Sequence, residues 1–225
     1  MKFKKVSIII SCVLVASVCT CVGLGLNKNN DKQTLFVTGI IPERTETEMY
    51  LDSDVILEGT VEKLLDSKWS NPNFHRGDDI SNVLQTDVIV NVDKVYGGNL
   101  LKDTVVVRID KGEDDNTIVY SEGYPDFEVG ENVLLFLSRD DSDVATNEDY
   151  YVLTGMKYGK YTLSNTTNTG MVRESRVYSN EKGQVNPQKI EATLKEMKEK
   201  NPNYKELKQK KMEETIKKNK ELFGE

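Results

Sequence analysis

Cysteine is confined to the first 21 residues of this 225-residue chain, at Cys12, Cys19 and Cys21. Disulfides and thiolate metal sites are therefore excluded from everything that follows. The chain also has a single histidine. A Ser-His-Asp triad could use only His75, and no G-x-S-x-G motif accompanies it.

Basic residues are too few to balance the acidic ones over most of the chain. Between Asn27 and Asn186, 29 acidic and 16 basic residues give a net charge of −13, whereas residues 187–225 hold 11 lysines and 8 glutamates. Nucleic-acid affinity comes largely from Lys and Arg side chains that displace counterions from phosphates. We therefore expect no nucleic-acid partner.

The abundant carboxylates follow no recognisable metal-binding or catalytic spacing. Asp141, Asp143 and Glu148, or the run Glu113–Asp115, offer oxygen ligands but lack the D-x-D-x-D-G pattern of a calcium loop. Glycoside hydrolysis needs two carboxylates that face each other, and the sequence singles out no such pair. We interpret these residues as solvated acids, and we predict no metal, no cofactor and no enzymatic activity.

The N-terminus combines a basic segment, Met1–Lys5, with the uncharged run Val6–Leu26. A membrane span needs about 20 apolar residues, whereas the apolar part of a signal peptide has about 7–15. We predict that residues 1–26 are an uncleaved single-pass anchor, with the rest of the chain outside the cytoplasm because the basic flank stays inside. A cleaved signal and a secreted protein remain the alternative. The residues before Cys19 and Cys21 fit a lipidation signal poorly.

Two alternating apolar runs surround Gly97-Gly98 within the stretch Gln85–Asp110, which predicts a long β-hairpin. The residues expected on its buried face are Val88, Val90, Val92, Val105, Val107 and Ile109. Such alternation is typical of a sheet with one buried face.

Further elements are predicted on both sides of this hairpin. They are strands at Leu35–Ile41, Asp54–Leu64 (bent at Gly59), Ile118–Tyr120 (a short edge strand), Val133–Leu137 (buried on both faces), Tyr150–Leu153 and Gly155–Leu163, and a short helix capped by Thr at Thr45–Leu51. Five main strands, a bend in the first and a long connection to the second indicate a mainly β fold, an OB-like five-stranded antiparallel barrel. We assign the barrel to residues 45–180 and a linker to residues 27–44.

The C-terminal segment 187–225 has two helix-start signals. Asn186-Pro187 and Asn201-Pro202 each place an Asn cap before a Pro, which predicts helices over Pro187–Lys200 and Pro202–Phe223. Their apolar stripes are narrow, so we interpret the segment as a solvated Lys/Glu-rich tail. Whether these helices pack on the barrel stays open.

Several of these strands resemble the OB-like domain of netrin-type and tissue-inhibitor-of-metalloproteinase-like proteins, as in exported proteins of Gram-positive bacteria. The resemblance covers residues 45–163 and rests on SDVILEGTV, VIVNVDKVYGGNL, TVVVRI, PDFEVGENVLLFL and GKYTL. Its most specific part is Phe127 with Gly130-Glu131 and Val133–Leu137. Inhibitors of that group use a free N-terminal cysteine to cap a catalytic zinc, and disulfides tie their domains. The exported part of this chain has no cysteine, so the resemblance implies the fold without that chemistry.

In OB barrels, the loops between strands one and two and between strands four and five frame the binding face. Here these are Leu65–Asn82 and Asp140–Asp149. Their candidate ligand-binding residues are Trp69, Phe74, His75, Arg76, Asp141 and Asp143. The alternative is that Trp69 and Phe74 fold back and plug the barrel end.

These features together predict a membrane-anchored, extracytoplasmic binding or interaction module without catalytic activity. A protein or glycan of the cell envelope is the expected kind of partner. A divergent peptidase inhibitor of the tissue-inhibitor-of-metalloproteinase-like type, which uses a loop as a wedge, is the alternative.

Overall fold

A computed structural model describes residues 32–39, 41, 43–75, 82–142, 144–164 and 177–223. Residues from Thr34 onward form one compact unit. The predicted anchor, residues 1–26, lies outside the described ranges. Inside those ranges, no helix has both the length and the apolar character needed to cross a membrane.

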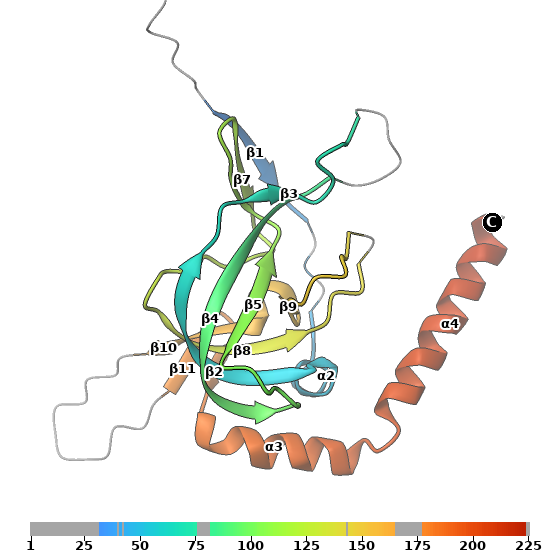
Figure 1. The fold of residues 1–225 in the computed structure, drawn as a ribbon. Coiled ribbons are helices and arrows are strands. Elements are labelled where there is room, and N and C mark those ends of the chain that lie inside the picture. Colours follow the sequence, from blue (N-terminus) through green and yellow to red (C-terminus); the bar gives the residue numbers. More distant parts are fainter. Residues whose placement is uncertain are drawn as a thin grey trace, which may run out of the picture. The chain divides into compact units, whose positions relative to one another are not determined.

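Five strands close into a barrel (Figure 1). They are β2 (Val55–Leu64), β4 (Leu84–Gly97), β5 (Thr104–Ile109), β8 (Asn132–Ser138) and β9 (Tyr151–Leu153). β2 pairs with β4, β4 with β5, β5 with β9, β9 with β8, and β8 again with β2. All pairs are antiparallel except β5–β9, which is parallel. The mainly β fold and the five-stranded barrel are therefore confirmed.

The barrel interior follows from the period-two patterns of its strands. The buried apolar residues that fill it include Val55, Leu57, Val61, Val88, Val90, Val105, Val107, Ile109, Phe127, Val133, Leu135 and Leu137. The predicted buried face of the hairpin is confirmed, although Val92 is only half-buried. Alternate side chains of each strand point to opposite faces, so the remaining residues lie on the outside of the barrel.

The connection between β4 and β5 is wider than a tight glycine turn. Pairing between the two strands ends at Asn91 and Thr104, and Gly97 pairs with Ile56 of β2 instead. Gly98 has a φ of +89° and approaches β2 so closely that a Cβ would lie 2.0 Å from the carbonyl oxygen of Asp54. Only glycine fits both conditions.

The predicted bend at Gly59 is confirmed. The β2–β4 register shifts between Glu58 and Gly59, and a Cβ at Gly59 would lie 2.4 Å from the carbonyl oxygen of Asn91. A bulge beside a glycine lets a long strand curve and serve two neighbours. β2 can thus pair with both β4 and β8.

A second apolar core covers the outer face of β2 and β8. Helices α2 (Glu46–Asp52) and α3 (Pro187–Lys200) pack there. The buried residues of this second core are Met49, Tyr50, Leu51, Ile56, Tyr96, Leu134, Phe136, Tyr178, Ile190 and Leu194. Burial of Val133–Leu137 on both faces is confirmed, because one face lines the barrel and the other lines this core.

The helices begin close to where their caps predict. Thr45 and Glu48 form a complete capping box at α2, and the Asn186 side chain caps α3. The interpretation of the tail as solvated is wrong for α3, because Ile190 and Leu194, four residues apart, are enough to bury one face. α4 (Tyr204–Phe223) begins two residues after the predicted Pro202, and its apolar residues Leu207, Met212 and Ile216 are exposed.

The predicted strand Gly155–Leu163 is partly wrong. Gly155 and Met156 have positive φ and begin the 3₁₀ helix η1 (Met156–Gly159), so strand β10 spans only Lys160–Ser164. β10 extends the sheet beyond β8, followed by β11 (Val177–Asn180) and β12 (Gly183–Val185). The strand that closes the barrel is β9.

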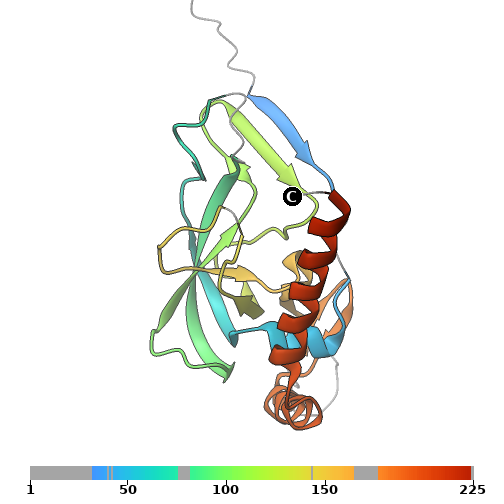
Figure 2. The same ribbon diagram turned by 90° about the vertical axis from the view of Figure 1, so that its right-hand side faces the viewer.

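Three strands form a separate small sheet in the order β1-β7-β6, with β1 and β7 side by side (Figures 1 and 2). They are β1 (Gln33–Val37), β7 (Thr117–Ser121) and β6 (Gly112–Glu113). The predicted Leu35–Ile41 strand exists with shifted bounds. The predicted edge strand Ile118–Tyr120 is instead the middle strand of this sheet. A short strand, β3 (Lys68–Trp69), pairs with the start of β4.

Candidate binding surface

A buried ion pair lies on the outer face of strands β4 and β5. Asp87 and Arg108 are directly opposite each other in the β4–β5 ladder, and their neighbours Val88 and Val107 point inward. Arg108 Nε donates to Asp87 Oδ1 at 2.7 Å, and Nη2 donates to Oδ2 at 2.9 Å. The Arg108 side chain is only 2% exposed. This bidentate geometry is the strong form of an Arg–carboxylate pair.

The two loops predicted to frame the ligand face meet above this pair. Lys68, in the connection from β2 to β4, places its Nζ 3.1 Å from Glu148 and 3.4 Å from Asp87. Glu148, in the connection from β8 to β9, accepts a hydrogen bond from Arg108 Nη2 at 2.5 Å. The centre of the Tyr150 ring lies 3.9 Å from the guanidinium carbon of Arg108. We call Lys68, Asp87, Arg108 and Glu148 the four-charge network.

Hydrogen bonds within the network favour the ionised form of Glu148. Hydrogen bonds from Arg108 and Lys68 lower the pKa of Glu148 from 4.5 to about 2. Burial works to lower the pKa of Arg108, but its bonds to Asp87 and Glu148 outweigh this and raise it. Partial burial opposes ionisation of Asp140, but hydrogen bonds from Tyr150 and Ser142 keep its pKa below the usual value. Two cations and two anions balance, so the four-charge network itself carries no net charge.

Trp69 adjoins the network but belongs to neither apolar core. It follows Lys68 in β3, is half-buried, and donates its indole N–H to Asp114 Oδ2 at 2.7 Å. Phe74 is half-buried and also absent from the two apolar clusters. The plug alternative is therefore not favoured. A half-buried aromatic ring fixed by its N–H group suits a contact surface.

The other candidate residues are spread more widely. His75 and Asp141 are exposed. Arg76 and Asp143 lie outside the described residues. The structure thus brings the two loops together through Lys68 and Glu148, whereas the six predicted residues stay predictions.

Sequence reasoning missed Lys68, Asp87 and Arg108. A signal for the last two was present, because a hairpin centred on Gly97-Gly98 places Asp87 opposite Arg108. Opposite charges that face each other on neighbouring strands stabilise the pairing of those strands. A loop that covers the two side chains buries the ion pair. Lys68 had no such signal, since its position depends on the path of a long connection.

A hollow of about 300 Å³ lies at the start of the same β8–β9 loop and includes Leu101, Arg139 and Tyr151 in its lining. Arg139 Nη1 donates to Asp149 at 2.8 Å, and its guanidinium carbon lies 4.2 Å from the Tyr151 ring centre. Hydrogen bonds from Lys102 and Arg139 lower the pKa of Asp149 to about 2. This second ion-paired group ties the loop to the β4–β5 connection.

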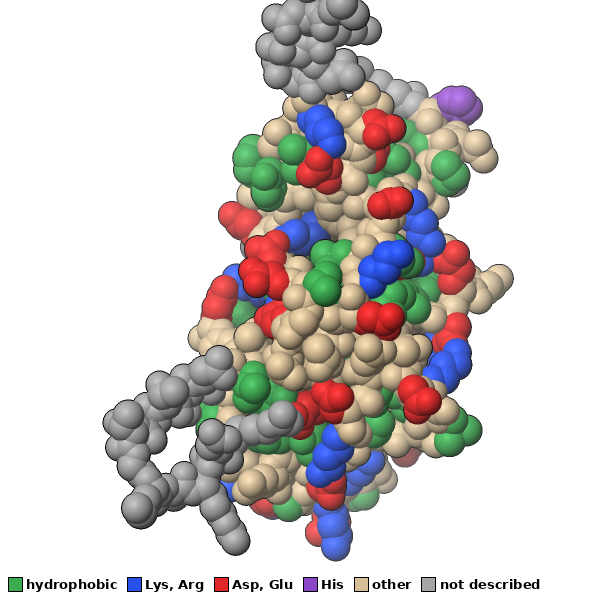
Figure 3. All heavy atoms as spheres, turned by 60° about the vertical axis from the view of Figure 1, so that its left-hand side comes forward, with side chains coloured by type: hydrophobic (Ala, Val, Ile, Leu, Met, Phe, Trp, Pro, Cys, Tyr) green, Lys and Arg blue, Asp and Glu red, His purple; other side chains and the backbone are tan. Residues whose placement is uncertain are grey.

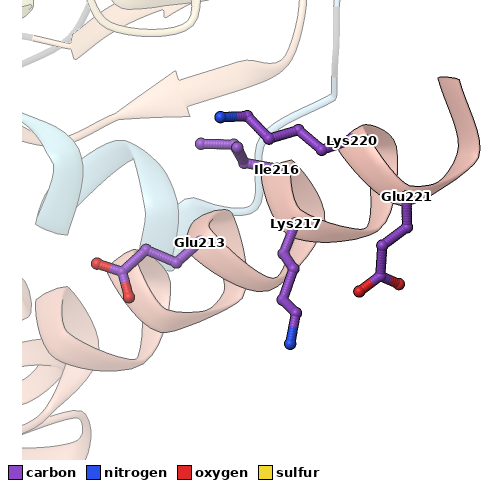
Figure 4. Close-up of a pocket in the computed structure, with 5 residues that line it drawn as sticks. All are labelled: Glu213, Ile216, Lys217, Lys220 and Glu221. Atoms are coloured by element: carbon purple, nitrogen blue, oxygen red, sulfur yellow. The ribbon is translucent and has the colours of Figure 1, made fainter. Parts of the chain in front are cut away.

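Two further hollows are formed mainly by described residues of the C-terminal helices. One of about 670 Å³ lies where α3 meets α4, and the residues that line it include Lys200, Tyr204 and Lys208. Another, shown in Figure 4, is lined by residues of α4 alone. In the described ranges, no three His, Cys, Asp or Glu side chains gather as metal ligands. On the face shown in Figure 3, acidic and basic side chains are interspersed.

No protein-family model matches this chain, and a search among characterised proteins finds no significant match.

Proposed function

We propose that the protein is a non-catalytic binding module built on an OB-like barrel and held outside the cytoplasm by residues 1–26. The strand order supports the OB-like assignment. Counting β2, β4, β5, β8 and β9 as strands one to five, the fifth lies between the third and the fourth, and the third and fifth are parallel. This is the order of an OB-type barrel, which binds ligands on the face of strands two and three.

The single observation that carries the binding role is the meeting of Lys68 and Glu148 above Asp87 and Arg108. The β2–β4 and β8–β9 connections and the strands β4 and β5 all supply polar groups to one surface. Trp69 adds an aromatic ring beside it. Rigid strands that position loop residues in this way are typical of binding sites. The balanced charges suit an uncharged or zwitterionic ligand, such as a glycan or a protein of the cell envelope.

The experiment is a pull-down from envelope extract with the tagged full-length chain. A Trp69→Ala/Phe74→Ala variant is compared with a control, Lys210→Ala/Lys217→Ala, that changes exposed residues of α4. We expect the wild type and the control to retain one component that the folded loop variant loses. Circular dichroism checks folding. Equal capture by all three proteins would remove the loops from the binding surface.

One observation favours peptidase inhibition as a second candidate. Leu101, in the connection between β4 and β5, is 92% exposed, whereas the adjacent Leu100 packs against the barrel core. An exposed apolar residue on an anchored loop is a suitable wedge for an apolar protease pocket. Inhibition of thermolysin by the full-length chain, abolished by Leu101→Asp, would favour this function. Full thermolysin activity at saturating protein would count against it.

A further inference from the structure

Strand β1 is exposed on both faces. The Phe36 side chain is 75% exposed and stacks on Tyr120 of β7, which is 50% exposed, with ring centres 5.4 Å apart and planes 16° apart. Leu35 and Val37 are also exposed. A stacked aromatic pair on an exposed strand leaves apolar area in water, and such area commonly marks an interaction surface.

One backbone edge of β1 has no strand beside it among the described residues, because β1 ends the order β1-β7-β6. The carbonyl of Val37 accepts a hydrogen bond from Glu122 N at 3.2 Å, so Val37 points its backbone groups toward β7. Backbone groups alternate in direction along a β-strand. The N–H and C=O groups of Thr34 and Phe36 therefore point away from β7, toward the open edge.

Within the part of the chain that the structure describes, the open edge has none of the usual protections against strand pairing. Natural edge strands are blunted by charges, prolines, bulges or covering segments. Gln33–Val37, with the sequence QTLFV, has no charge, no proline and no glycine. It is an uncharged strip in a chain region that otherwise carries a net charge of −13 between Asn27 and Asn186.

We propose that this edge pairs with β1 of a second copy of the chain, antiparallel and with Leu35 opposite Leu35. In this register Thr34 of each copy faces Phe36 of the other, and about four backbone hydrogen bonds form, since these are the residues that point outward. Two acidic bodies repel each other, so contact through uncharged strands is the approach with the lowest electrostatic cost. The pair joins two three-stranded sheets into one.

The area buried by this strand pair alone is small, so the dimer depends on a high local concentration of the chain. A stable dimer buries about 1,200–2,000 Å² in total, more than one pair of five-residue strands supplies. β1 begins at Gln33, and the proposed anchor ends at residue 26, so only a short segment separates them. Two copies in one membrane would therefore hold their β1 strands at a high local concentration.

The test is disulfide trapping in the full-length chain, with Cys12, Cys19 and Cys21 changed to alanine. Residues directly opposite in a non-hydrogen-bonded pair have Cα atoms about 4.5 Å apart, within the range a disulfide spans. We therefore expect Leu35→Cys to form a cross-linked dimer in membranes at least about tenfold faster than Leu101→Cys, an exposed control remote from β1 in sequence.

A second variant tests the backbone geometry. Adding Thr34→Pro removes an outward N–H group without removing a bond to β7, and proline is tolerated on strand edges. We expect it to slow trapping of Leu35→Cys several-fold while circular dichroism stays unchanged. The proposal would be overturned if Leu35→Cys is trapped no faster than Leu101→Cys. It would also be overturned if Thr34→Pro leaves the trapping rate unchanged in a folded protein.

Discussion

The barrel wall is covered in two different ways on its two sides. Outside β2 and β8, the cover is apolar: α2 and α3 pack against Ile56, Leu134 and Phe136. Outside β4 and β5, the cover is ionic: two loops meet above Asp87 and Arg108 through Lys68 and Glu148. Each cover hides part of the outer face of the barrel from water.

The two covers differ in how firmly they are attached. Apolar contacts stabilise in proportion to the area they bury, and salt does not screen them. Exposed ion pairs contribute only about 0–1 kcal/mol each and weaken as salt screens them. We therefore expect the helical side to behave as permanent structure and the loop side to open more readily, as a binding surface requires.

The largest expected effect lies on the helical side. Phe136→Ala removes a fully buried ring that meets Tyr50 edge-on with centres 5.2 Å apart. We expect a loss of about 3–5 kcal/mol in the free energy of unfolding, because a Phe-sized cavity forms. Urea denaturation measures it, and Val129→Ala, at an exposed apolar residue, serves as the control. A loss below about 1 kcal/mol would mean that the second core is not closely packed.

The next effect tests the buried part of the ionic side. Asp87→Ala leaves the Arg108 guanidinium buried with only the exposed Glu148 as a carboxylate partner. We expect a loss of about 3 kcal/mol, since removing one member of a buried pair strands the other charge. The double variant Asp87→Ala/Arg108→Met should recover most of it in the same urea assay. No recovery would show that Asp87 acts through other contacts.

A smaller effect concerns the cap of α2. Thr45→Ala removes the side chain that accepts a hydrogen bond from the Glu48 N–H group. We expect a loss of about 1 kcal/mol in the free energy of unfolding, measured by thermal denaturation. Thr215→Ala, within exposed α4, is the matched control and should change little. Equal losses in both variants would contradict a role for the cap.

The smallest effect belongs to the exposed part of the network. The Glu148 side chain is 55% exposed, so solvent screens it, and we expect Glu148→Gln to lower stability by at most about 1 kcal/mol at low salt. Since the pKa of Glu148 is lowered from 4.5 to about 2, its contribution is fully present above pH 4.5. The contribution is lost as the pH falls toward 2.

Urea titrations of wild type and Glu148→Gln at several pH values measure this difference. We expect the two proteins to converge near pH 2 and also in about 1 M salt, where the Debye length is about 3 Å. A difference that survives both conditions would show that Glu148 acts by packing and not by charge.

The barrel was predictable because its strands obey a local rule. Alternation in β4 and β5, the bend at Gly59 and the caps at Thr45 and Asn186 are all visible in short stretches of sequence. The 3₁₀ helix that begins after Gly155 was not predictable in the same way. Tyr150–Leu153 and Gly155–Leu163 read as two strands, but which of them closes the barrel depends on partners far away in the chain.

The candidate surface was predictable only at the level of loops. The connections at 65–82 and 140–149 were identified as its frame, and they do meet. Lys68 was missed because a single cation in a long connection carries no pattern. The signal for Arg108 lies in its position opposite Asp87 across the hairpin and not in its own type. The packing of α3 was missed for a related reason, since two apolar residues do not distinguish a buried helix from a solvated one.

The barrel is closed by its shortest strand, and this affects the order of folding. β9 meets β5 through only two residue pairs, Val107 with Tyr151 and Arg108 with Val152, and residues 110–150 lie between these strands in the chain. Closing so long a loop for so few contacts is entropically unfavourable, so we expect this joint to form last and to exchange its amide hydrogens first. Arg108 belongs to both the joint and the four-charge network. Each opening of the joint would therefore loosen the strand that supports the proposed binding surface.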